Sequence, residues 1–226
     1  GRNLGAAKAK GEYLLFLDDD NVIDKDMISN LTTFFESNNG QEYVMIGPIM
    51  LYLSKPEKIW MRYVKINMLT SQAVSLGNKE NYQSGCGVFE TGLLPNCFMV
   101  KQEDFKSING FDEKFIVMYE EADLAFRLKK KFNKKIAVIE NSITHHDVEF
   151  NIPGLTHTCR SEARSYLTAR NRVYFMKKNA SIFQLLIFFI LFFPLISGVY
   201  IFHLLKEKRY KESYSYFKGC FAGWIL

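Results

Sequence analysis

The sequence GEYLLFLDDDN, residues 11–21, decides how the rest of the chain is interpreted. Residues 13–17 form a short apolar run without a polar break, which predicts a buried strand. The strand runs directly into three carboxylates, Asp18, Asp19 and Asp20. Open α/β sheets bind ligands beyond the C-terminal ends of their strands, and a divalent cation relieves the repulsion between neighbouring acids. The stretch alone leaves two interpretations open, a metal site and a solvated turn that caps a helix.

The length and composition of the chain indicate one globular core. Its 226 residues are 48% hydrophobic and 23% charged, which allows one sizeable domain and little more. The net charge is +5, although the acids cluster at residues 18–20 and 120–123. This pattern favours anionic small molecules or a membrane surface as partners and argues against nucleic acid. Four cysteines without a CxxC spacing, and the absence of a signal peptide, predict reduced thiols in a cytosolic compartment.

The chain begins inside an expected helix. Residues 1–10 are rich in Ala and Lys, and Gly11 stands where a glycine often closes a helix. A parallel strand over residues 13–17 needs neighbouring strands that come earlier in the sequence. We therefore expect the natural protein to continue on the N-terminal side.

Helical and extended segments alternate over the following residues. Gly47 and Pro48 interrupt an apolar run, which predicts a strand that is bent or lies at an edge of the sheet. The expected elements are a helix from Asp24 or Asp26 to about 37, a strand over 43–53, a helix over 58–68, a loop beside the site over 70–87, strand pieces over 88–100, a helix over 102–108 and a loop over the site at 149–160.

A second informative stretch is MYEEADLAFRLKKKF, residues 118–132, which has apolar residues at helical spacing. Glu121 shares the buried face of this expected helix. Glu120 and Asp123 lie on another face, where Asp123 can pair with Arg127 one turn later. The helix N-terminus stabilises acids, which explains Glu120 and Asp123. It explains Glu121 less well, and a partly buried carboxylate is suited to act as a general base.

Two further groups of polar residues belong to expected elements. A strand over 134–140 is followed by His145 and His146, which suit either a structural role or metal binding. A helix over 161–179 carries Arg170 on its apolar face. A guanidinium that is directed inward usually meets an anion, either a phosphate or a structural carboxylate.

Residues 182–205 are almost uncharged and long enough to span a bilayer, which requires roughly 20 residues. Pro194 and Gly198 interrupt this segment, and basic residues on both sides of it do not orient a single span. A kinked, re-entrant or interfacial segment with both ends in the cytoplasm fits better than a helix packed on a partner subunit. Residues 210–226, aromatic and basic, suit the headgroup level of a membrane.

Several stretches together resemble the inverting family 2 glycosyltransferases of the GT-A fold, particularly the rhamnosyltransferase-like branch. The matching stretches are GRNLGAAKAKGEYLLFLDDDN, NGFDEKFIVMYEEADLAFRL, ITHHD and YLTARNRVYFMKKN, in the family's order and spacing over most of residues 1–179. The resemblance implies an α/β GT-A domain over residues 1–180, Rossmann-like, with a mixed sheet and flanking helices. It also implies that the N-terminal nucleotide-binding strands are missing, and that residues 181–226 form a hydrophobic, membrane-associated helical tail.

The resemblance further implies roles for individual residues. Asp18 and Asp20 correspond to the family's DxD motif, which holds Mg²⁺ or Mn²⁺ on the donor diphosphate, and His145 would be a further metal ligand. Glu121 stands where the family usually has the catalytic Asp of its ED motif. Because this sequence has Glu-Glu there, Asp123 is the second candidate base. The resemblance places Asp18, Asp19, Arg170, Asn171, Arg2 and Asn3 on the donor, and Gly110, Phe111, Asp112 and Glu120 on the acceptor side.

These assignments predict a metal-assisted, inverting glycosyltransferase at the cytoplasmic face of the cell membrane. It would move a sugar from a UDP-, dTDP- or GDP-linked donor to a glycan, lipid-linked or protein acceptor in the synthesis of cell-surface polysaccharide or glycoconjugate. Contact with the membrane through residues 182–205 would be peripheral, re-entrant or single-pass, and a homodimer is left open. Two alternatives stay open. One is a Mg²⁺-dependent phosphohydrolase or phosphotransferase, for which Asp18-x-Asp20-x-Val22 is a partial motif, and the other is a non-catalytic sugar-binding platform.

Overall fold

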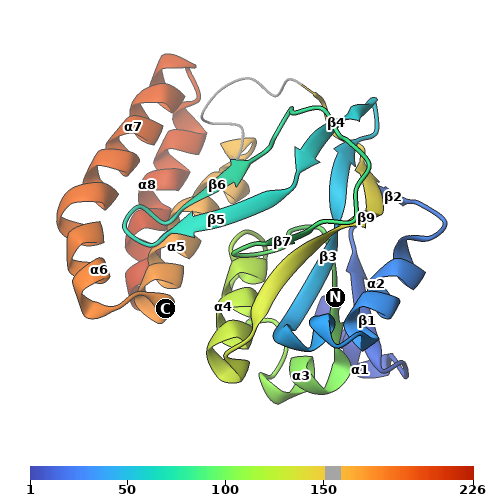
Figure 1. Ribbon diagram of the computed structural model, residues 1–226. Helices are drawn as coiled ribbons and strands as arrows, with labels where there is room; N and C mark the ends of the chain where they lie inside the picture. The colour runs from blue at the N-terminus through green and yellow to red at the C-terminus, as the bar shows by residue number, and fades with distance from the viewer. Residues whose placement is uncertain (151–158) are drawn as a thin grey trace. The chain divides into compact units, whose positions relative to one another are not determined.

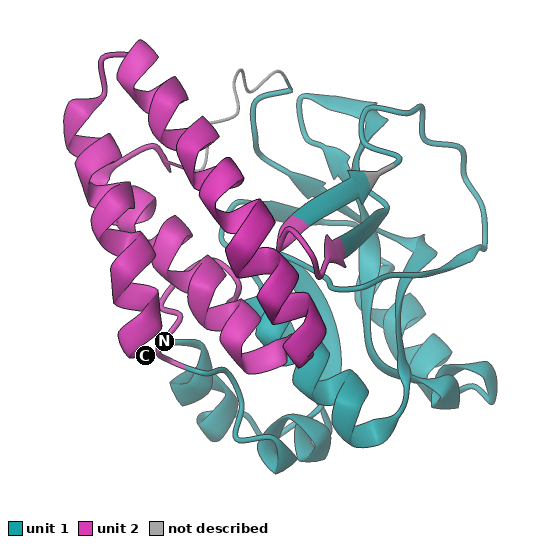
Figure 2. Cartoon of the chain, turned by 90° about the vertical axis from the view of Figure 1, so that its left-hand side faces the viewer, with its two compact units in different colours: residues 1–65, 73–112, 121–150 teal, residues 66–72, 113–120, 151–226 magenta. Residues whose placement is uncertain are grey.

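The computed structural model describes residues 1–150 and 159–226, which belong to two compact units (Figure 1, Figure 2). Unit 1 comprises residues 1–65, 73–112 and 121–150, and unit 2 comprises residues 66–72, 113–120 and 151–226. Most of the loop expected over 149–160 lies outside the described residues. The domain boundary at residue 180 stays a prediction.

A mixed sheet forms the centre of unit 1 (Figure 1). Its seven described strands are β1 (Tyr13–Leu17), β2 (Asn21–Ile23), β3 (Tyr43–Tyr52), β4 (Lys55–Met61), β7 (Val88–Glu90), β8 (Cys97–Lys101) and β9 (Lys135–His146). Five of them lie in the order β1–β8–β3–β9–β2, with β4 beside β3 and β7 beside β9. β3 runs parallel to β9, whereas its pairings with β8 and β4 are antiparallel. The expected mixed sheet is thus confirmed.

Helices flank this sheet, as expected. They are α1 (Arg2–Lys8), α2 (Met27–Glu36), α3 (Gln102–Ser107) and α4 (Glu120–Phe132), with a short 3-10 helix over Asn39–Glu42. The apolar spacing of α2 buries Met27, Leu31 and Phe35 against unit 1. α1 ends earlier than expected, because Ala9 is already extended, two residues before Gly11.

β3 occupies the middle of the sheet, although Gly47 and Pro48 predicted a bent or edge strand. Its first residue, Tyr43, is partly buried, and the nine residues after it are buried. β3 pairs with β8 up to Ile46 and with β4 from Met50 onward. Pro48 therefore lies between two hydrogen-bonded stretches, where its missing N–H removes no bond on that side. The register with β9 also shifts directly after Pro48.

The helix expected over 58–68 is wrong. The chain there forms β4 and then β5 (Tyr63–Asn67), which pairs with β6 (Gln72–Leu76) in a separate two-stranded sheet. In a strand, successive side chains point to opposite faces, so buried and less buried residues alternate. The residues of β4 and β5 follow this alternation better than they follow the spacing of a helix. The buried residues of this region are Ile59, Met61, Val64 and Ile66.

Unit 2 is helical in its C-terminal part (Figure 2). Its helices are α5 (Glu162–Asn179), α6 (Ile182–Ile187), α7 (Phe193–Lys206) and α8 (Tyr210–Ile225), with a π-helical turn over Phe188–Phe192 between α6 and α7. Pro194 is the second residue of α7, after Phe193, and so lies close behind this turn. A proline has no N–H to donate and its ring crowds the preceding turn, so the wider π turn accommodates it without ending the helix.

α8 packs closely on α5, so the face of α8 that meets α5 cannot contact a membrane. The membrane role expected for residues 210–226 is therefore limited to the other face of the helix. A side chain at Gly219 would overlap the carbonyl oxygen of Tyr166, and one at Gly223 would overlap that of Arg170. The two glycines therefore allow the backbones to approach each other. The opposite face of α8 exposes Tyr210, Tyr214, Phe217, Phe221 and Trp224.

Candidate active site

The acids after β1 lie in a tight turn that returns the chain to the sheet as β2. The N–H of Asp18 donates to the carbonyl of Asn96 (2.9 Å), and the N–H of Asn21 donates to the carbonyl of Asp18 (3.2 Å). The side-chain amide of Asn21 also donates to Oδ1 of Asp20 (3.1 Å). The side chains of Asp18 and Asp20 are 34% and 47% exposed, and Asp19 is exposed. The turn thus presents its acids to solvent at the end of the strand.

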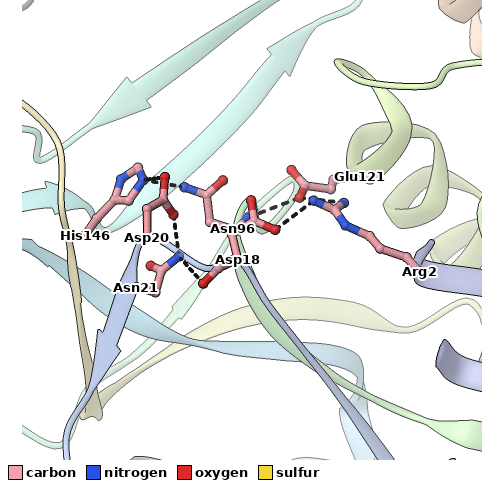
Figure 3. Close-up of polar contacts among 7 residues, drawn as sticks. All are labelled: Arg2, Asp18, Asp20, Asn21, Asn96, Glu121 and His146. Carbon is pink, nitrogen blue, oxygen red and sulfur yellow. Dashed lines mark hydrogen bonds and ion pairs between the residues drawn. The ribbon is translucent and has the colours of Figure 1, made fainter.

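Arg2 joins Asp18 to Glu121 (Figure 3). Its Nη2 lies 2.9 Å from Oδ1 of Asp18, and its Nη1 lies 3.1 Å from Oε1 of Glu121. The guanidinium also lies over the ring of Phe111, 5.3 Å from its centroid. One fixed cation therefore holds two acids from distant parts of the sequence in a single cluster. This contact explains how the acids of the site lie close together without strong repulsion.

Asn3 and Phe111 fix the start of α1 to the chain before α4. The Nδ2 of Asn3 donates to the carbonyl of Phe111, and the N–H of Phe111 donates back to Oδ1 of Asn3, each at 2.9 Å. Gly110 has φ +64°, and a side chain there would lie 2.6 Å from Oδ1 of Asn3. Phe111 is buried and packs edge-on against Phe16. Of the residues expected on the acceptor side, Gly110 and Phe111 therefore pack against Asn3, next to the cluster of acids. Asp112 and Glu120 are half-buried, and a role of these four residues in acceptor binding stays a prediction.

Glu121 lies in the first turn of α4, with its side chain 14% exposed. Its Oε1 accepts the N–H of Asn96 (3.2 Å) as well as the Arg2 guanidinium. Asn96 has φ +63°, a left-handed conformation that asparagine tolerates better than most residues. Glu121 is thus oriented by two donors from different parts of the chain, which suits a group that must meet a substrate hydroxyl.

Asp123 is fully buried, which contradicts the expectation that it lies away from the buried face. Its Oδ2 lies 2.7 Å from Nε of Arg127, which confirms the expected pair one turn apart. Arg127 Nη1 in turn donates to the carbonyl of Ile108 (2.8 Å). Asp123 and Arg127 thus connect α4 to the end of α3. In this position Asp123 is shielded from solvent. Its role as a second candidate base stays a prediction.

The structure brings His146, one residue after the expected ligand His145, to Asp20 (Figure 3). The Nε2 of His146 lies 3.2 Å from Oδ2 of Asp20, and 3.1 Å from Nδ2 of Asn96. His145 instead lies 3.2 Å from Oδ1 of Asp24. Successive side chains of a strand point to opposite faces, so two adjacent histidines of β9 cannot share one site.

Asp20 and His146 bring a carboxylate oxygen and an imidazole nitrogen, two kinds of metal-ligand atom, within 3.2 Å of each other. The Nδ1 of His146 is buried and has no hydrogen-bond partner among the described residues. No group of three His, Cys, Asp or Glu residues that could hold a metal is found in residues 1–150 and 159–226. Mg²⁺ and similar ions often take one or two protein ligands and complete their shell with substrate phosphates and water. Asp18, which was also expected to bind the metal, forms an ion pair with Arg2 in the structure.

Arg170 and Asn171 of α5, expected at the donor, hold the segment before α4. The Nδ2 of Asn171 donates to the carbonyls of Phe115 and Val117, each at 2.7 Å. The Nη2 of Arg170 donates to the carbonyls of Lys114 and Phe115. Both α5 residues are buried. These contacts position a loop, and a role on the diphosphate stays a prediction.

The loop that they hold is strained. Ile116, Met118 and Tyr119 have φ values of 65°, 69° and 68°, a conformation that residues with side chains rarely adopt. Each such residue costs about 1–3 kcal/mol, and surrounding contacts must hold it in place. The buried guanidinium of Arg172 contributes, because its Nε donates to the hydroxyl of Tyr119 (3.4 Å). The strained loop ends directly before Glu121 in the sequence.

Sequence reasoning did not find Asn96 or Trp60. Asn96 joins both halves of the cluster, because it contacts Glu121 through its backbone and His146 through its side chain. Trp60 places its ring edge-on against His146, with 4.3 Å between centroids. Neither residue belongs to a recognisable motif, and only the pairing of the strands brings them to the site.

The comparisons with known proteins concern the sequence family and the fold. A family model described as "Glycosyltransferase like family 2" matches residues 1–188. The chain is similar to GalNAc-T7 in a crystal structure with UDP, GalNAc and Mn²⁺, at 14% identity and a TM-score of 0.53, covering 76% of this chain and 36% of that one. It is also similar to TarS of S. aureus, at 16% identity and a TM-score of 0.40, covering 76% and 26%. No curated protein matches the chain.

The likeness to GalNAc-T7 concerns the fold, because the sequences share few identical residues. The chain spans about a third of the length of that protein, 36%.

Proposed function

The chain belongs to the glycosyltransferase family 2-like proteins, and from this premise we propose how its site transfers a sugar. The donor is a nucleotide-sugar linked through UDP, dTDP or GDP, and the acceptor is a glycan, a lipid-linked sugar or a protein. The reaction serves the synthesis of cell-surface polysaccharide or glycoconjugate. The observation that carries the proposal is the contact of Arg2 with both Asp18 and Glu121, which lies 119 residues away from it.

Glu121 acts as the general base. Its carboxylate is oriented by the guanidinium of Arg2 and by the N–H of Asn96. It removes the proton from the acceptor hydroxyl as that oxygen attacks the anomeric carbon. The bond to the departing nucleoside diphosphate breaks on the opposite side. One base and a single displacement invert the anomeric configuration.

Asp18, Asp19, Arg2 and Asn3 lie on the donor side. Asp18 accepts from Arg2, so a donor that reaches this acid also meets the guanidinium. Asp20 and His146 would hold Mg²⁺ or Mn²⁺, and the ion would offset the negative charge that builds on the leaving diphosphate. The crystal structure of GalNAc-T7 contains Mn²⁺ and UDP, which supports a divalent ion beside a nucleotide in this fold.

Unit 2 carries the proposed membrane contact at the cytoplasmic face. Ile182–Lys206 forms a continuous helical stretch of 25 residues with a mean hydropathy of 2.6, long and apolar enough to cross a membrane. Only 22% of its most apolar window is buried. One such helix is weak support by itself, so peripheral, re-entrant and single-pass arrangements remain alternatives. The exposed aromatic face of α8 favours an interfacial position.

The proposal is tested by donor turnover. The full-length natural protein is incubated with UDP-, dTDP- and GDP-sugars, with Mn²⁺, with Mg²⁺ and with EDTA, and release of the nucleoside diphosphate is measured. We expect metal-dependent release from one nucleotide class, which falls at least a hundredfold in the Glu121→Gln variant. Release of phosphate from a phosphomonoester would instead support a phosphohydrolase. Sugar binding without any turnover would support a non-catalytic platform.

A further inference from the structure

A hollow of about 460 Å³ lies in unit 1, and none of its lining residues takes part in the proposed reaction. Its wall includes Arg62, at the bend between β4 and β5. Arg62 follows Trp60 by two residues, so their Cα atoms are at most about 7 Å apart. Trp60 contacts His146, and it lies where the pairing of β4 with β3 shifts register. Such irregularities often re-aim side chains beside active sites.

The guanidinium of Arg62 is held in place but its donors are not fully used. It lies over the ring of Phe89, 5.0 Å from the centroid. Its Nη1 lies 3.5 Å from Glu80 and its Nη2 lies 3.8 Å from Glu140, which are ion-pair distances longer than a good hydrogen bond. Its Nε is buried and has no hydrogen-bond partner among the described residues. The side chain as a whole is 23% exposed and lines the hollow, so its guanidinium can present N–H donors there in a fixed orientation.

The surroundings of Arg62 select against an anionic ligand. The carboxylates of Glu80 and Glu140 are paired with its charge, and a third carboxylate, that of Glu90, lines the hollow. Val88, Tyr63 and Phe89 give the wall an apolar part. A volume of this size matches small-molecule sites, which combine apolar walls with a few fixed polar groups. A neutral ring that carries several hydroxyl groups satisfies both kinds of wall, because it can accept from Arg62 and donate to the carboxylates.

We propose that this hollow is a saccharide subsite, which holds a neutral sugar unit of the acceptor at a distance from the reacting hydroxyl. The inference rests on the proposed function, since a transferase of glycans needs such a hold on its acceptor. Binding energy from a part of the substrate that does not react can then help to place the part that does.

The test measures binding of simple sugars by saturation-transfer NMR. The probes are neutral methyl glycosides of glucose, galactose, N-acetylglucosamine and rhamnose, with methyl glucuronide as the charged comparison. We expect at least one neutral glycoside to bind and not to be displaced by UDP with Mn²⁺. The Arg62→Lys variant should weaken that binding about tenfold, because it loses a hydrogen bond from a charged donor. Arg164→Lys, an exposed arginine of α5, is the matched control and should bind as the unmodified protein does.

Three results would each overturn the subsite: no neutral glycoside binds, UDP displaces the bound glycoside, or Arg62→Lys binds it unchanged. If Arg62→Lys does not fold, as judged by circular dichroism, Tyr63→Leu takes its place and the same weakening is expected. Binding does not depend on turnover. Failure of nucleotide-sugar turnover with glycoside binding intact would therefore count against the proposed function and not against the subsite.

Discussion

His146 Nε2 lies 3.2 Å from Oδ2 of Asp20, whereas the neighbouring His145 Nε2 lies 3.2 Å from Oδ1 of Asp24. The antiparallel register explains the difference, because Asn21 pairs with His146 across β2 and β9 and so places Asp20 beside it. A strand directs successive side chains to opposite faces. Only one of two adjacent histidines can therefore join the acids of the proposed donor site.

The first prediction concerns metal affinity. The His146→Ala variant should raise the Mn²⁺ concentration for half-maximal donor turnover at least tenfold, since mutations around metal sites cost about 10–100-fold in affinity. His145→Ala is the matched comparison, and we expect it to change that concentration much less. The reverse order of effects would show that His145, the residue expected from the sequence, holds the ion.

The second prediction separates the two candidate bases. Glu121→Gln should lower kcat by about 10²–10⁴-fold, the range for loss of a general base, while UDP binding measured by calorimetry is retained. Asp123→Asn should lower the free energy of unfolding, because Asp123 is buried against Arg127. The variant leaves the guanidinium of Arg127 beside a neutral amide in place of a carboxylate. The matched control is Glu103→Gln, an exposed acid of α3. A normal kcat in Glu121→Gln would remove the base assignment.

The third prediction concerns the strained loop before Glu121. Asn171→Ala removes the donor to the carbonyls of Phe115, Val117 and Met118, and we expect a loss of roughly 3 kcal/mol in the free energy of unfolding. Urea unfolding followed by circular dichroism measures this loss. Asn30→Ala is the control, since Asn30 is only partly buried and donates one hydrogen bond to the carbonyl of Asn141. Equal losses in both variants would mean that Asn171 does not hold the loop.

Much of the fold was predictable because local patterns and burial agree. The amphipathic spacing of α2 and the helix expected over 102–108 appear in the structure as expected. β1 forms at its expected residues, but only Leu14 of it is buried and it pairs antiparallel with β8, whereas a buried strand with parallel neighbours was expected. The errors occur where tertiary context overrides a local pattern. Pro48 lies inside a central strand because the neighbours of β3 change beside it, which no local pattern of the sequence reveals.

The candidate site was predictable in its acids and less so in their partners. The cluster of Asp18, Asp20 and Glu121 follows from motifs, whereas the contact of Arg2 with two of them depends on how α1 meets α4. Asn96 could not be predicted, because its contribution to Glu121 comes from a backbone N–H in a left-handed conformation. Every residue except proline has that backbone group, so the presence of an asparagine in the sequence does not reveal which acceptor its N–H meets.

The fourth prediction concerns stability at high pH. Burial raises the pKa of the Cys97 thiol to about 12, from an ordinary value near 9. Above pH 9 the unfolded chain loses this proton while the folded chain keeps it, so the free energy of unfolding falls as pH rises, by up to about 1.4 kcal/mol per pH unit. Urea unfolding between pH 8 and 10.5 should show a steeper fall than in a Cys97→Ala variant. The exposed Cys86 gives the control variant, Cys86→Ala, which should leave the slope unchanged.

The fifth prediction concerns the aromatic face of α8. Phe217 and Phe221 are 50% and 59% exposed, and their rings lie 5.0 Å apart between centroids on the face that turns away from α5. Lys211 and Lys218 of the same helix are exposed, which favours a surface of anionic lipid. Burial of two phenylalanines contributes several kcal/mol, so replacing both by serine should lower binding to vesicles containing phosphatidylglycerol at least tenfold.

Flotation of the purified protein with these vesicles, and with vesicles of phosphatidylcholine alone, measures the difference. Val88→Ser is the matched control, because Val88 is an exposed apolar residue of unit 1. Washing the vesicles with alkaline carbonate then separates two arrangements. Release of the protein supports an interfacial position for α6 and α7, whereas retention supports a span. Unchanged binding in the double serine variant would place the membrane contact elsewhere than on α8.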